Sequence, residues 1–372
     1  MTAGDAFNSL AEELEALFGR GVDADLSEGV FTELALRVFR VQFEGNTTYR
    51  AFCEARGATP DSVTRWQDVP AVPSTAFKYV DLAVGAARDV ATVFRTSGTT
   101  RGGEIRGRHL VPRPSLYRAA LLPNLGTNLV PEDAPLPILS LIPSPEDAPE
   151  SSLSAMMGVA AERWGDPVRW LAHPDTGPDV DGFLEAAGEV IATGRAALVA
   201  GTAFAFVHVL DELASRGEAV TLPEGSRIME TGGFKGRSRT VARDDLYLDL
   251  QRRLGVPVGR VINEYGMTEL LSQLYEPLLR EGPGATRRHV SPPWLRVRAL
   301  DPTTLEPVVP GTNGLLCFFD LANAGSVSHV LTEDVGTVSP DGVRLQGRVA
   351  GAEPRGCSLA LEEILTVSAA RR

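Results

Sequence analysis

The sequence predicts an α/β protein in which a mainly parallel sheet is followed by a smaller β-rich part. Short apolar stretches alternate with helical stretches between residues 90 and 266, and after residue 290 the pattern changes to short strands and turns. Strands separated by helices form a mainly parallel sheet that is covered on both faces. With 372 residues, of which 43% are hydrophobic, the chain can bury a sizeable core in one or two domains.

We expect three parts along the chain. A helical segment over residues 1–80 packs on the core, an α/β core spans 81–290, and 291–372 form a β-rich subdomain with a C-terminal tail. Apolar side chains of the first part recur at helical spacing. This pattern predicts three helices, over 5–20, 29–44 and 47–57.

The core alternates between strands and helices. Apolar runs predict strands over 90–97, 136–144, 168–172, 196–202, 226–233 and 259–266. Helical spacing predicts helices near 113–122, 152–164, 180–193, 203–216 and 240–254. Because ligands bind at the carboxyl ends of the strands in such sheets, the residues that follow each strand are the candidates for a binding site.

The net charge of −12 argues against two classes of partner. Binding to nucleic acid or to anionic membranes depends on an excess of lysine and arginine. The longest apolar run, residues 196–210, is shorter than the ~18 residues of a membrane-spanning helix, and the N-terminus lacks the features of a signal peptide. Three cysteines without paired spacing favour a reducing, cytoplasmic location.

A stretch rich in glycine and hydroxyl groups follows the first strand of the core. It reads "TSGTTRGG" over residues 96–103. Backbone N–H groups and hydroxyls of such a loop surround a phosphate, and glycine lets the backbone approach closely. The stretch lacks the Gly-Lys-Ser/Thr ending of a Walker loop. It predicts a phosphate-binding loop of another kind, and an ordinary turn is the alternative.

The stretch "INEYGMTEL" (262–270) places several functional groups behind a second strand. Tyr265 offers a ring that can stack on a base, and Thr268 offers a hydroxyl. Glu269 is the type of carboxylate that holds Mg²⁺ together with phosphate oxygens. The alternative is a capped turn.

Two more stretches follow strands. In "METGGFKGR" (229–237), Gly232 and Gly233 suit a flat ligand pressed on the backbone, and Lys235 is one of few lysines. In "VLTEDVG" (330–336), Asp334 ends an apolar strand, where an acidic residue can hold the hydroxyls of a ribose. A turn aspartate is the alternative for Asp334.

Taken in order, these stretches resemble the acyl-adenylate-forming (ANL) superfamily. "TSGTTRGG" resembles its phosphate loop, with Arg101 in place of a glycine, and "YGMTE" and "LTEDVG" resemble its later motifs. Within the superfamily the chain is most similar to the acyl-protein synthetase (LuxE-type) branch, nearly end to end. The similarity includes "YRAFCEARG", "VPAVPSTAFKY", "ETGGFKGR" and the tail "GRVAGAEPRGCSLALEE".

The resemblance implies an acyl-adenylate-forming ligase that uses ATP and Mg²⁺. A carboxylic acid, of the fatty type, becomes acyl-AMP with release of pyrophosphate, and the acyl group then passes to a thiol. Thr268 would contact the α-phosphate and Glu269 would bind the metal. The other positions implied for nucleotide binding are Ser97, Gly98, Thr99, Thr100 and Arg101 at the phosphates, Gly232, Gly233, Tyr265 and Gly266 around the adenine, and Asp334 and Arg348 near the ribose.

The tail bears on the second half of the reaction. Most members of the superfamily carry a further C-terminal domain with a catalytic lysine, and we expect this chain to lack it. In the acyl-protein synthetase branch a cysteine near the C-terminus takes the acyl group, and Cys357 matches it. Arg355 and a helix starting at Ser358 would favour the thiolate. Lys235 and His109 are the candidates for the task of the missing lysine.

Other functions are compatible with the sequence. The first alternative is an acyl- or aryl-CoA ligase of the phenylacetate-ligase type, and the second is a non-catalytic nucleotide-binding subunit of a reductase complex. If Cys357 carries the acyl group, the partner that receives it would be an acyl reductase, an acyl carrier protein or an acyltransferase.

Overall fold

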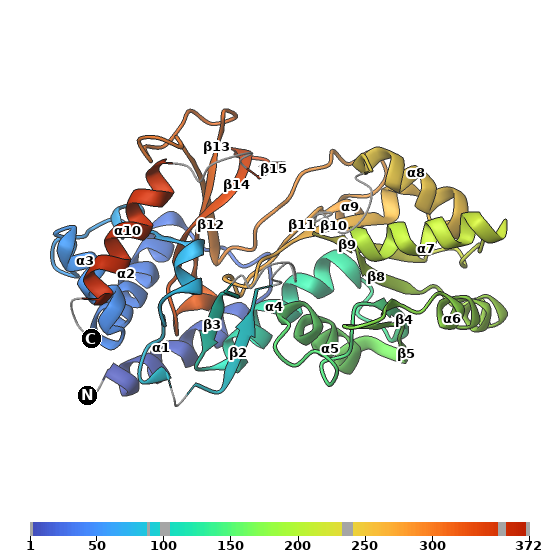
Figure 1. Ribbon diagram of the computed structural model, residues 1–372, viewed down its shortest axis with the longest axis horizontal. Helices are drawn as coiled ribbons and strands as arrows, with labels where there is room; N and C mark the ends of the chain where they lie inside the picture. The colour runs from blue at the N-terminus through green and yellow to red at the C-terminus, as the bar shows by residue number, and fades with distance from the viewer. Residues whose placement is uncertain (1–2, 88–89, 97–104, 233–240, 349–354, 370–372) are drawn as a thin grey trace. The chain divides into compact units, whose positions relative to one another are not determined.

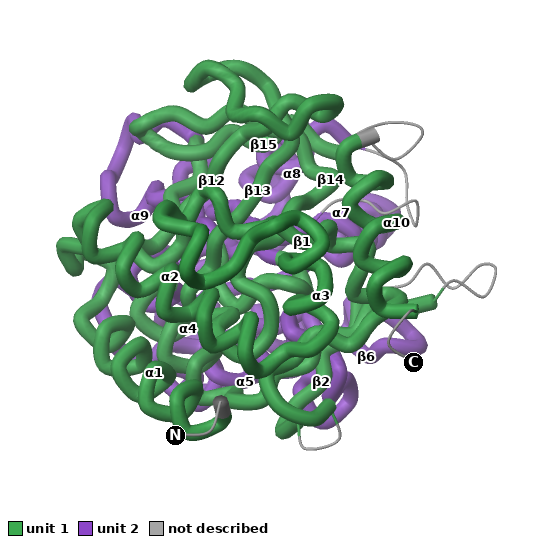
Figure 2. Tube along the Cα trace, turned by 90° about the vertical axis from the view of Figure 1, so that its left-hand side faces the viewer, with its two compact units in different colours: residues 1–124, 267–273, 288–372 green, residues 125–266, 274–287 purple. Residues whose placement is uncertain are grey.

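The computed structural model describes residues 3–87, 90–96, 105–232, 241–348 and 355–369. The chain forms two compact units, which Figure 2 shows in different colours. Unit 1 comprises residues 1–124, 267–273 and 288–372, and unit 2 comprises 125–266 and 274–287. Helix α4 (Pro114–Leu129) carries the chain from unit 1 into unit 2.

Unit 2 is built on a six-stranded sheet with the order β11-β10-β9-β8-β4-β5 (Figure 1). All neighbours in it are parallel except β11, which is antiparallel to β10. The strands are β4 (Leu136–Leu141), β5 (Gly165–Trp170), β8 (Leu198–Thr202), β9 (Arg227–Thr231), β10 (Val261–Tyr265) and β11 (Leu274–Tyr275). A short pair, β6 (Ala172–His173) and β7 (Gly177–Pro178), follows β5.

Three helices of unit 2, α6 (Val180–Thr193), α7 (Ala203–Arg216) and α8 (Arg243–Leu254), bury one face of this sheet. The unit also contains α5 (Ser152–Trp164), α9 (Leu278–Glu281) and the 3-10 turn η4 (Val258–Arg260). Ile228 of β9 and Val261 of β10 belong to one buried cluster with Phe206 of α7 and Tyr247 of α8. Because side chains alternate along a strand, the neighbours of Ile228 in β9 and of Val261 in β10 point to the opposite face of the sheet.

Capping residues explain where two of these helices begin. The side chain of Asp179 accepts a hydrogen bond from Gly182 N at 2.9 Å, and that of Thr202 accepts one from Ala205 N at 3.1 Å. Such bonds satisfy N–H groups that the first helical turn leaves without a partner. Helix α6 ends at Gly194, whose φ of +68° favours glycine.

Unit 1 contains a five-stranded sheet in which β1, β14, β13 and β12 lie in that order and β15 pairs with β14. The strands are β1 (Val72–Pro73), β12 (Leu295–Leu300), β13 (Asn313–Asp320), β14 (His329–Ser339) and β15 (Gly342–Arg348). A separate antiparallel hairpin is formed by β2 (Thr92–Arg95) and β3 (Arg108–Val111).

Four helices of unit 1 are α1 (Ala3–Phe18), α2 (Glu28–Gly45), α3 (Thr47–Ala55) and α10 (Arg355–Ala369), with 3-10 turns η1 (Trp66–Asp68), η2 (Ser74–Lys78) and η5 (Leu321–Asn323). Helix α10 packs on α3, β1 and β14. Its contact with α3 includes an ion pair of 2.8 Å between Arg56 and Glu363. The C-terminal helix is therefore part of the packed body of unit 1.

The α/β class and the mainly parallel sheet expected from the sequence are confirmed. The helices expected over 152–164, 180–193 and 203–216 have these bounds in the structure. Three expectations need correction. The strand near 90–97 pairs in the antiparallel hairpin of unit 1 and not in the parallel sheet, α4 continues through Pro123 to Leu129, and the last helix begins at Arg355 and not at Ser358.

The division into parts over 1–80, 81–290 and 291–372 follows changes of sequence pattern and stays a prediction. Among the described residues, no helix combines the length and the apolar character that crossing a membrane requires.

Candidate active site

The stretch "YGMTE" lies where the chain changes unit. Strand β10 of unit 2 ends at Tyr265, residues 267–273 belong to unit 1, and the chain returns to unit 2 at Leu274 in β11. Tyr265 and Gly266 are therefore held by unit 2, whereas Thr268 and Glu269 are held by unit 1.

The carboxyl ends of β9 and β10 lie side by side in unit 2. In the parallel register Asn263 is paired with Glu230 and Glu264 with Thr231. Paired residues on neighbouring strands share a face, so these four polar side chains form two pairs on opposite faces of the sheet. Gly232 follows β9 with a φ of +76°, a conformation that favours glycine.

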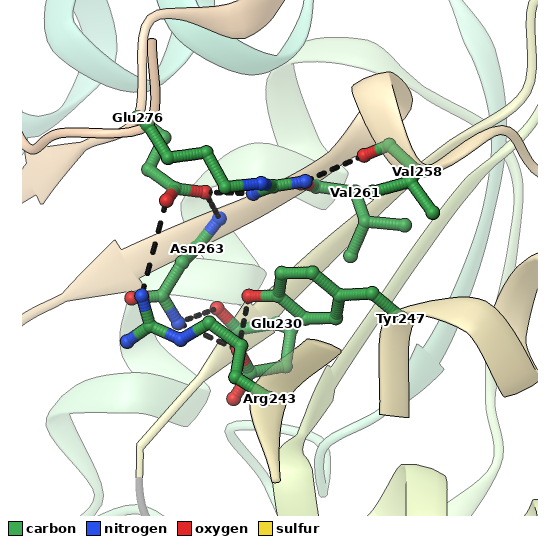
Figure 3. Close-up of polar contacts among 8 residues, drawn as sticks. Glu230, Arg243, Tyr247, Val258, Val261, Asn263 and Glu276 are labelled. Atoms are coloured by element: carbon green, nitrogen blue, oxygen red, sulfur yellow. Dashed lines mark hydrogen bonds and ion pairs between the residues drawn. The ribbon is translucent and has the colours of Figure 1, made fainter. Parts of the chain in front are cut away.

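The first pair belongs to a buried polar network around Glu230, shown in Figure 3. The Glu230 carboxyl accepts hydrogen bonds from Asn263 Nδ2 at 2.6 Å and from the Tyr247 hydroxyl at 3.0 Å. Burial raises the pKa of Glu230 to about 7, although both hydrogen bonds oppose the shift. The carboxyl can therefore hold a proton near neutral pH.

Glu276 extends the network along the edge of β10. Its Oε2 accepts from Asn263 N at 3.0 Å and from Arg287, which also donates to Val258 O at 2.6 Å and Val261 O at 3.1 Å. Strand β11 pairs only with the last two residues of β10. The two side chains thus satisfy backbone groups that the short neighbouring strand leaves open.

The second pair lies on the other face. The Thr231 hydroxyl donates a hydrogen bond to the Glu264 carboxyl, and both side chains are buried. Burial raises the pKa of Glu264 to about 7. The ends of β9 and β10, directly before Gly232 and Tyr265, are therefore bonded to each other on both faces of the sheet.

In unit 1, three buried side chains hold the backbone of residues 268–272. His109 Nδ1 lies 2.7 Å from Thr268 O, and Asn323 Nδ2 donates to Glu269 O at 2.7 Å. Asp320 accepts hydrogen bonds from backbone N–H groups further along the same stretch. Glu269 itself is buried, with 8% of its surface exposed.

The His109 ring is neutral. Burial lowers its pKa to about 4, and because Nδ1 faces a carbonyl oxygen, that nitrogen carries the proton. Nε2 is buried and has no hydrogen-bond partner among the residues described. His109 is therefore placed to orient Thr268 through Nδ1.

The hairpin of β2 and β3 fixes the base of the predicted phosphate loop. Thr96 N donates to Gly107 O at 3.0 Å, Gly107 N donates to Thr96 Oγ1 at 2.8 Å, and Arg106 Nε donates to Thr96 O at 2.7 Å. The five residues expected to bind phosphate in this loop lie outside the described part of the chain: Ser97, Gly98, Thr99, Thr100 and Arg101. Gly233 and Lys235 also lie outside it.

Strands β14 and β15 bring Asp334 and Arg348 together. The two residues are paired in the antiparallel register, and Arg348 Nε donates to Asp334 Oδ1 at 2.9 Å. The Asp334 side chain is 13% exposed and that of Arg348 is 63% exposed. A mostly buried carboxylate with an accessible arginine beside it is an arrangement that can accept hydrogen bonds from two neighbouring hydroxyls.

Cys357 lies in the first turn of α10 and is 1% exposed. Its Sγ is 3.9 Å from Thr332 O, and its neighbours in a buried cluster include Leu331 and Cys317. From the sequence we expect this cysteine just before a helix, in a loop. The structure places the thiol inside the helix, facing the core of unit 1. Cys53 and Cys317 are buried as well.

Sequence reasoning missed the residues that support the stretch 261–273. Each of them is a polar residue at the end of an apolar strand or directly behind one. They are Glu230 in "RIMETGG", Glu264 in "VINEYG", and Asp320 and Asn323 in "CFFDLAN". A carboxylate inside such a run is the available signal, because burying one requires specific hydrogen bonds.

Comparison with known proteins agrees with this architecture. The acyl-protein synthetase, LuxE, family matches residues 21–366. Two ligases named long-chain-fatty-acid–luciferin-component ligase are similar: one from Vibrio harveyi, 22% identical over 90% of this chain and 88% of that protein, and one from Aliivibrio fischeri, 23% identical over the same shares.

Among solved structures, 2-hydroxyisobutyryl-CoA ligase in complex with 2-HIB-AMP shares the fold. Its TM-score is 0.64 at 14% identity, covering 86% of this chain and 68% of that one. The family match spans most of the chain, and the fold likeness is to an adenylate-forming (ANL) ligase. The chain therefore belongs to the acyl-protein synthetase (LuxE) family and is an acyl-adenylate-forming ligase.

Proposed function

We propose that this enzyme is an ATP-dependent acyl-protein synthetase that activates a fatty acid and transfers the acyl group to Cys357, to a partner protein, or to both in turn. The single observation that carries the proposal is the position of the "YGMTE" stretch. The carboxyl of Glu264, directly before it, is bonded to Thr231, and the carbonyls of Thr268 and Glu269 within it are bonded to His109 and Asn323. The names of the two bacterial relatives, both long-chain fatty-acid ligases, support the substrate class.

In the first half-reaction a carboxylate oxygen attacks the α-phosphorus of ATP and pyrophosphate leaves. Attack by one anion on another requires that the phosphate charge be neutralised. Ser97, Thr99 and Thr100 surround the phosphates in this proposal, Gly232 and Tyr265 flank the adenine, and Asp334 holds the ribose. Thr268 donates to the α-phosphate.

Glu269 is the proposed metal ligand. Mg²⁺ is typically held by one or two carboxylates together with the phosphates of its nucleotide, so a single carboxylate fits. When bound, the ion neutralises phosphate charge. Glu269 is buried and its own peptide carbonyl is fixed by Asn323 at 2.7 Å, which restricts where the carboxylate can lie.

In the second half-reaction the Cys357 thiolate attacks the acyl carbonyl. A thioester forms, AMP leaves with the electron pair of the broken C–O bond, and the thiol proton passes to solvent. Because Cys357 is 1% exposed in the structure, this step requires α10 to move away from β14. The partner that takes the acyl group onward would be an acyl reductase, an acyl carrier protein or an acyltransferase in the cytoplasm.

The experiment has two readouts. ATP–pyrophosphate exchange with acids of increasing chain length tests the first half-reaction, and exchange with none of them would refute it. Mass spectrometry of the intact chain after incubation with ATP, Mg²⁺ and the best acid tests the second. We expect one added acyl group, lost in Cys357→Ala and retained in Cys53→Ala, the matched control.

The burial of Cys357 also favours a second candidate, an acyl- or aryl-CoA ligase that delivers the acyl group directly to a soluble thiol. In that case Cys357→Ala would form acyl-CoA as fast as the wild type, and no acylated chain would accumulate.

A further inference from the structure

Residues 267–273 have no regular secondary structure, yet Leu270 to Gln273 are buried. Buried backbone N–H and C=O groups need partners, and here side chains from other elements supply several of them. Besides the bonds to Thr268 O and Glu269 O, Asn124 Nδ2 donates to Gln273 O at 2.7 Å. The conformation of this segment is therefore determined by a few side chains from elsewhere in unit 1.

Asp320 makes the largest number of these contacts. It is fully buried at the end of β13, and its Oδ2 accepts from Leu271 N at 3.0 Å and from Ser272 N at 2.9 Å. Its Oδ1 accepts from Ser272 Oγ at 2.7 Å and from Ala322 N at 3.0 Å. Four donors converge on one carboxylate, which is how a buried charge is compensated without a cation.

Asn323 follows three residues later, in η5. Its Nδ2 donates to Glu269 O at 2.7 Å and to Val327 O at 3.2 Å, so one amide links the segment to the backbone just before β14. His109 approaches from β3, where its ring also packs edge-on against Phe77. Three different elements thus converge on five residues of backbone.

We propose that His109, Asp320 and Asn323, called here the anchor set, are positioning residues that place Thr268 and Glu269 for nucleotide and metal binding. The anchor set bonds to the backbone at 268, 269, 271 and 272, so it fixes the main chain from which the side chains of Thr268 and Glu269 extend. The proposal rests on the function proposed above, because it assumes that these two side chains act on ATP and Mg²⁺.

Positioning of this kind has a measurable effect. Octahedral Mg²⁺ sites tolerate little variation in ligand position. A displacement of ~1 Å from a group outside the reaction centre can lower a rate by ~100-fold. Loss of one anchor should therefore change the Mg²⁺ requirement and the turnover more than it changes the affinity for the acid.

Asp320→Asn is the central variant, because it keeps the shape and removes one acceptor oxygen and the charge. Its matched control is Asp301→Asn. Asp301 is also in unit 1 and also accepts from two consecutive backbone N–H groups, Thr303 N at 2.8 Å and Thr304 N at 2.9 Å, but in an exposed turn. We expect Asp320→Asn to lower the kcat of ATP–pyrophosphate exchange ~10–100-fold and to raise the Mg²⁺ concentration for half-maximal rate, with Asp301→Asn unchanged.

Two variants of His109 separate positioning from folding. In His109→Asn the side-chain amide nitrogen takes the place of Nδ1 and can still donate to Thr268 O, whereas His109→Leu cannot. We expect the Asn variant to retain the Mg²⁺ dependence of the wild type and the Leu variant to lose it. If both behave alike, the hydrogen bond to Thr268 has no positioning role.

Calorimetric titration of ATP with and without Mg²⁺ keeps the two proposals distinguishable. If the wild type binds ATP more tightly with Mg²⁺, and Asp320→Asn loses that difference, the anchor set acts as proposed even if no acid supports exchange and the adenylation proposal fails. If Asp320→Asn retains both the Mg²⁺ effect and the exchange rate, the anchor proposal is overturned while adenylation stands. If the wild type does not bind ATP, both are overturned.

Hydrogen exchange of the peptide covering 267–273 distinguishes a local loss of positioning in Asp320→Asn from a general loss of folding. Asp320→Asn should speed exchange of this peptide while peptides of β12 exchange as in the wild type. Equal exchange of the segment in both proteins would contradict the anchor role directly.

Discussion

The hydroxyl of Thr231 and the carboxyl of Glu264 are bonded to each other at the ends of two neighbouring parallel strands. Each residue directly precedes one of the residues expected to flank the adenine, Gly232 and Tyr265. On the opposite face of the same strands, Glu230 and Asn263 make the corresponding contact. The relative position of Gly232 and Tyr265 is thus set by buried hydrogen bonds within unit 2.

Thr231→Val should weaken ATP binding, because valine keeps the shape of threonine and removes the donor to Glu264. A buried acceptor left without its partner costs about 1–3 kcal/mol. We expect a ~10-fold higher KM for ATP in pyrophosphate exchange and a lower free energy of unfolding. Thr193→Val is the control, because the Thr193 hydroxyl caps the end of α6 by donating to Val190 O at 2.9 Å. Equal KM values in the two variants would contradict the prediction.

The contribution of Glu264 to stability should fall as the pH rises from about 4.5 through 7, whereas the buried His109, whose pKa is lowered to about 4, acts in the opposite direction below pH 6.5. Burial raises the pKa of Glu264 from 4.5 to about 7, so between these values the folded state binds more protons than the unfolded state. The stabilisation is complete below 4.5 and is lost as the pH passes 7, with a size on the order of 3 kcal/mol. Glu230, whose pKa is also raised to about 7, acts in the same direction.

Glu264→Gln tests the sign of this effect, because the amide resembles the protonated carboxyl at every pH. In urea unfolding at several pH values, the stability of the wild type relative to Glu264→Gln should fall between pH 5 and 7, because the contribution of the buried histidines is the same in both proteins. A difference that stays constant over this range would show that Glu264 is ionised in the folded state.

Local patterns of the sequence predicted much of the fold and less of the site. The helices α5, α6 and α7 were predicted to the residue, because capping residues such as Asp179 and Thr202 stand next to regular apolar spacing. The strand near 90–97 was assigned to the wrong sheet. Its pattern shows that it is a strand but does not show which partner it pairs with.

Contacts between distant residues explain what the sequence could not predict. Asp320 meets Ser272 across 48 residues and Asn323 meets Glu269 across 54. No spacing rule connects such positions, so both residues were missed although each interrupts an apolar run. The burial of Cys357 is a third case, because it depends on where α10 packs and not on the residues around the cysteine.

Cys357 should react slowly with iodoacetamide, and weakening the attachment of α10 should speed the reaction. Arg56 of α3 and Glu363 of α10 form an ion pair of 2.8 Å, with each side chain about one third exposed. A surface pair of this kind contributes ~0.2–1 kcal/mol, which corresponds to an increase of up to ~5-fold in the open population. Glu363→Gln should therefore raise the alkylation rate of Cys357 by that factor.

The control for this variant is Asp61→Asn, which breaks the ion pair of 3.1 Å between Arg40 and Asp61 without touching α10. Its alkylation rate should equal that of the wild type. If Cys357 of the wild type reacts as fast as an exposed thiol, the buried position does not limit access to it.

Arg287→Met should destabilise unit 2 strongly. Glu276 is 1% exposed, and Arg287 donates to its Oε2 and to the carbonyls of Val258 and Val261, whereas Arg243, the second arginine beside this carboxyl, lies 4.0 Å from Oε1. Removing the hydrogen-bonded partner of a buried ion pair costs up to about 3–5 kcal/mol. Arg252→Met, which breaks an exposed pair with Asp249 on α8, should cost less than about 1 kcal/mol. Hydrogen exchange of peptides from β10 in rising urea measures the stability of both variants.

Adding Glu276→Gln to Arg287→Met should recover part of the lost stability, because a neutral amide can still accept the hydrogen bond from Asn263 N. Equal urea midpoints for the two arginine variants would show that the buried pair contributes no more than a surface one.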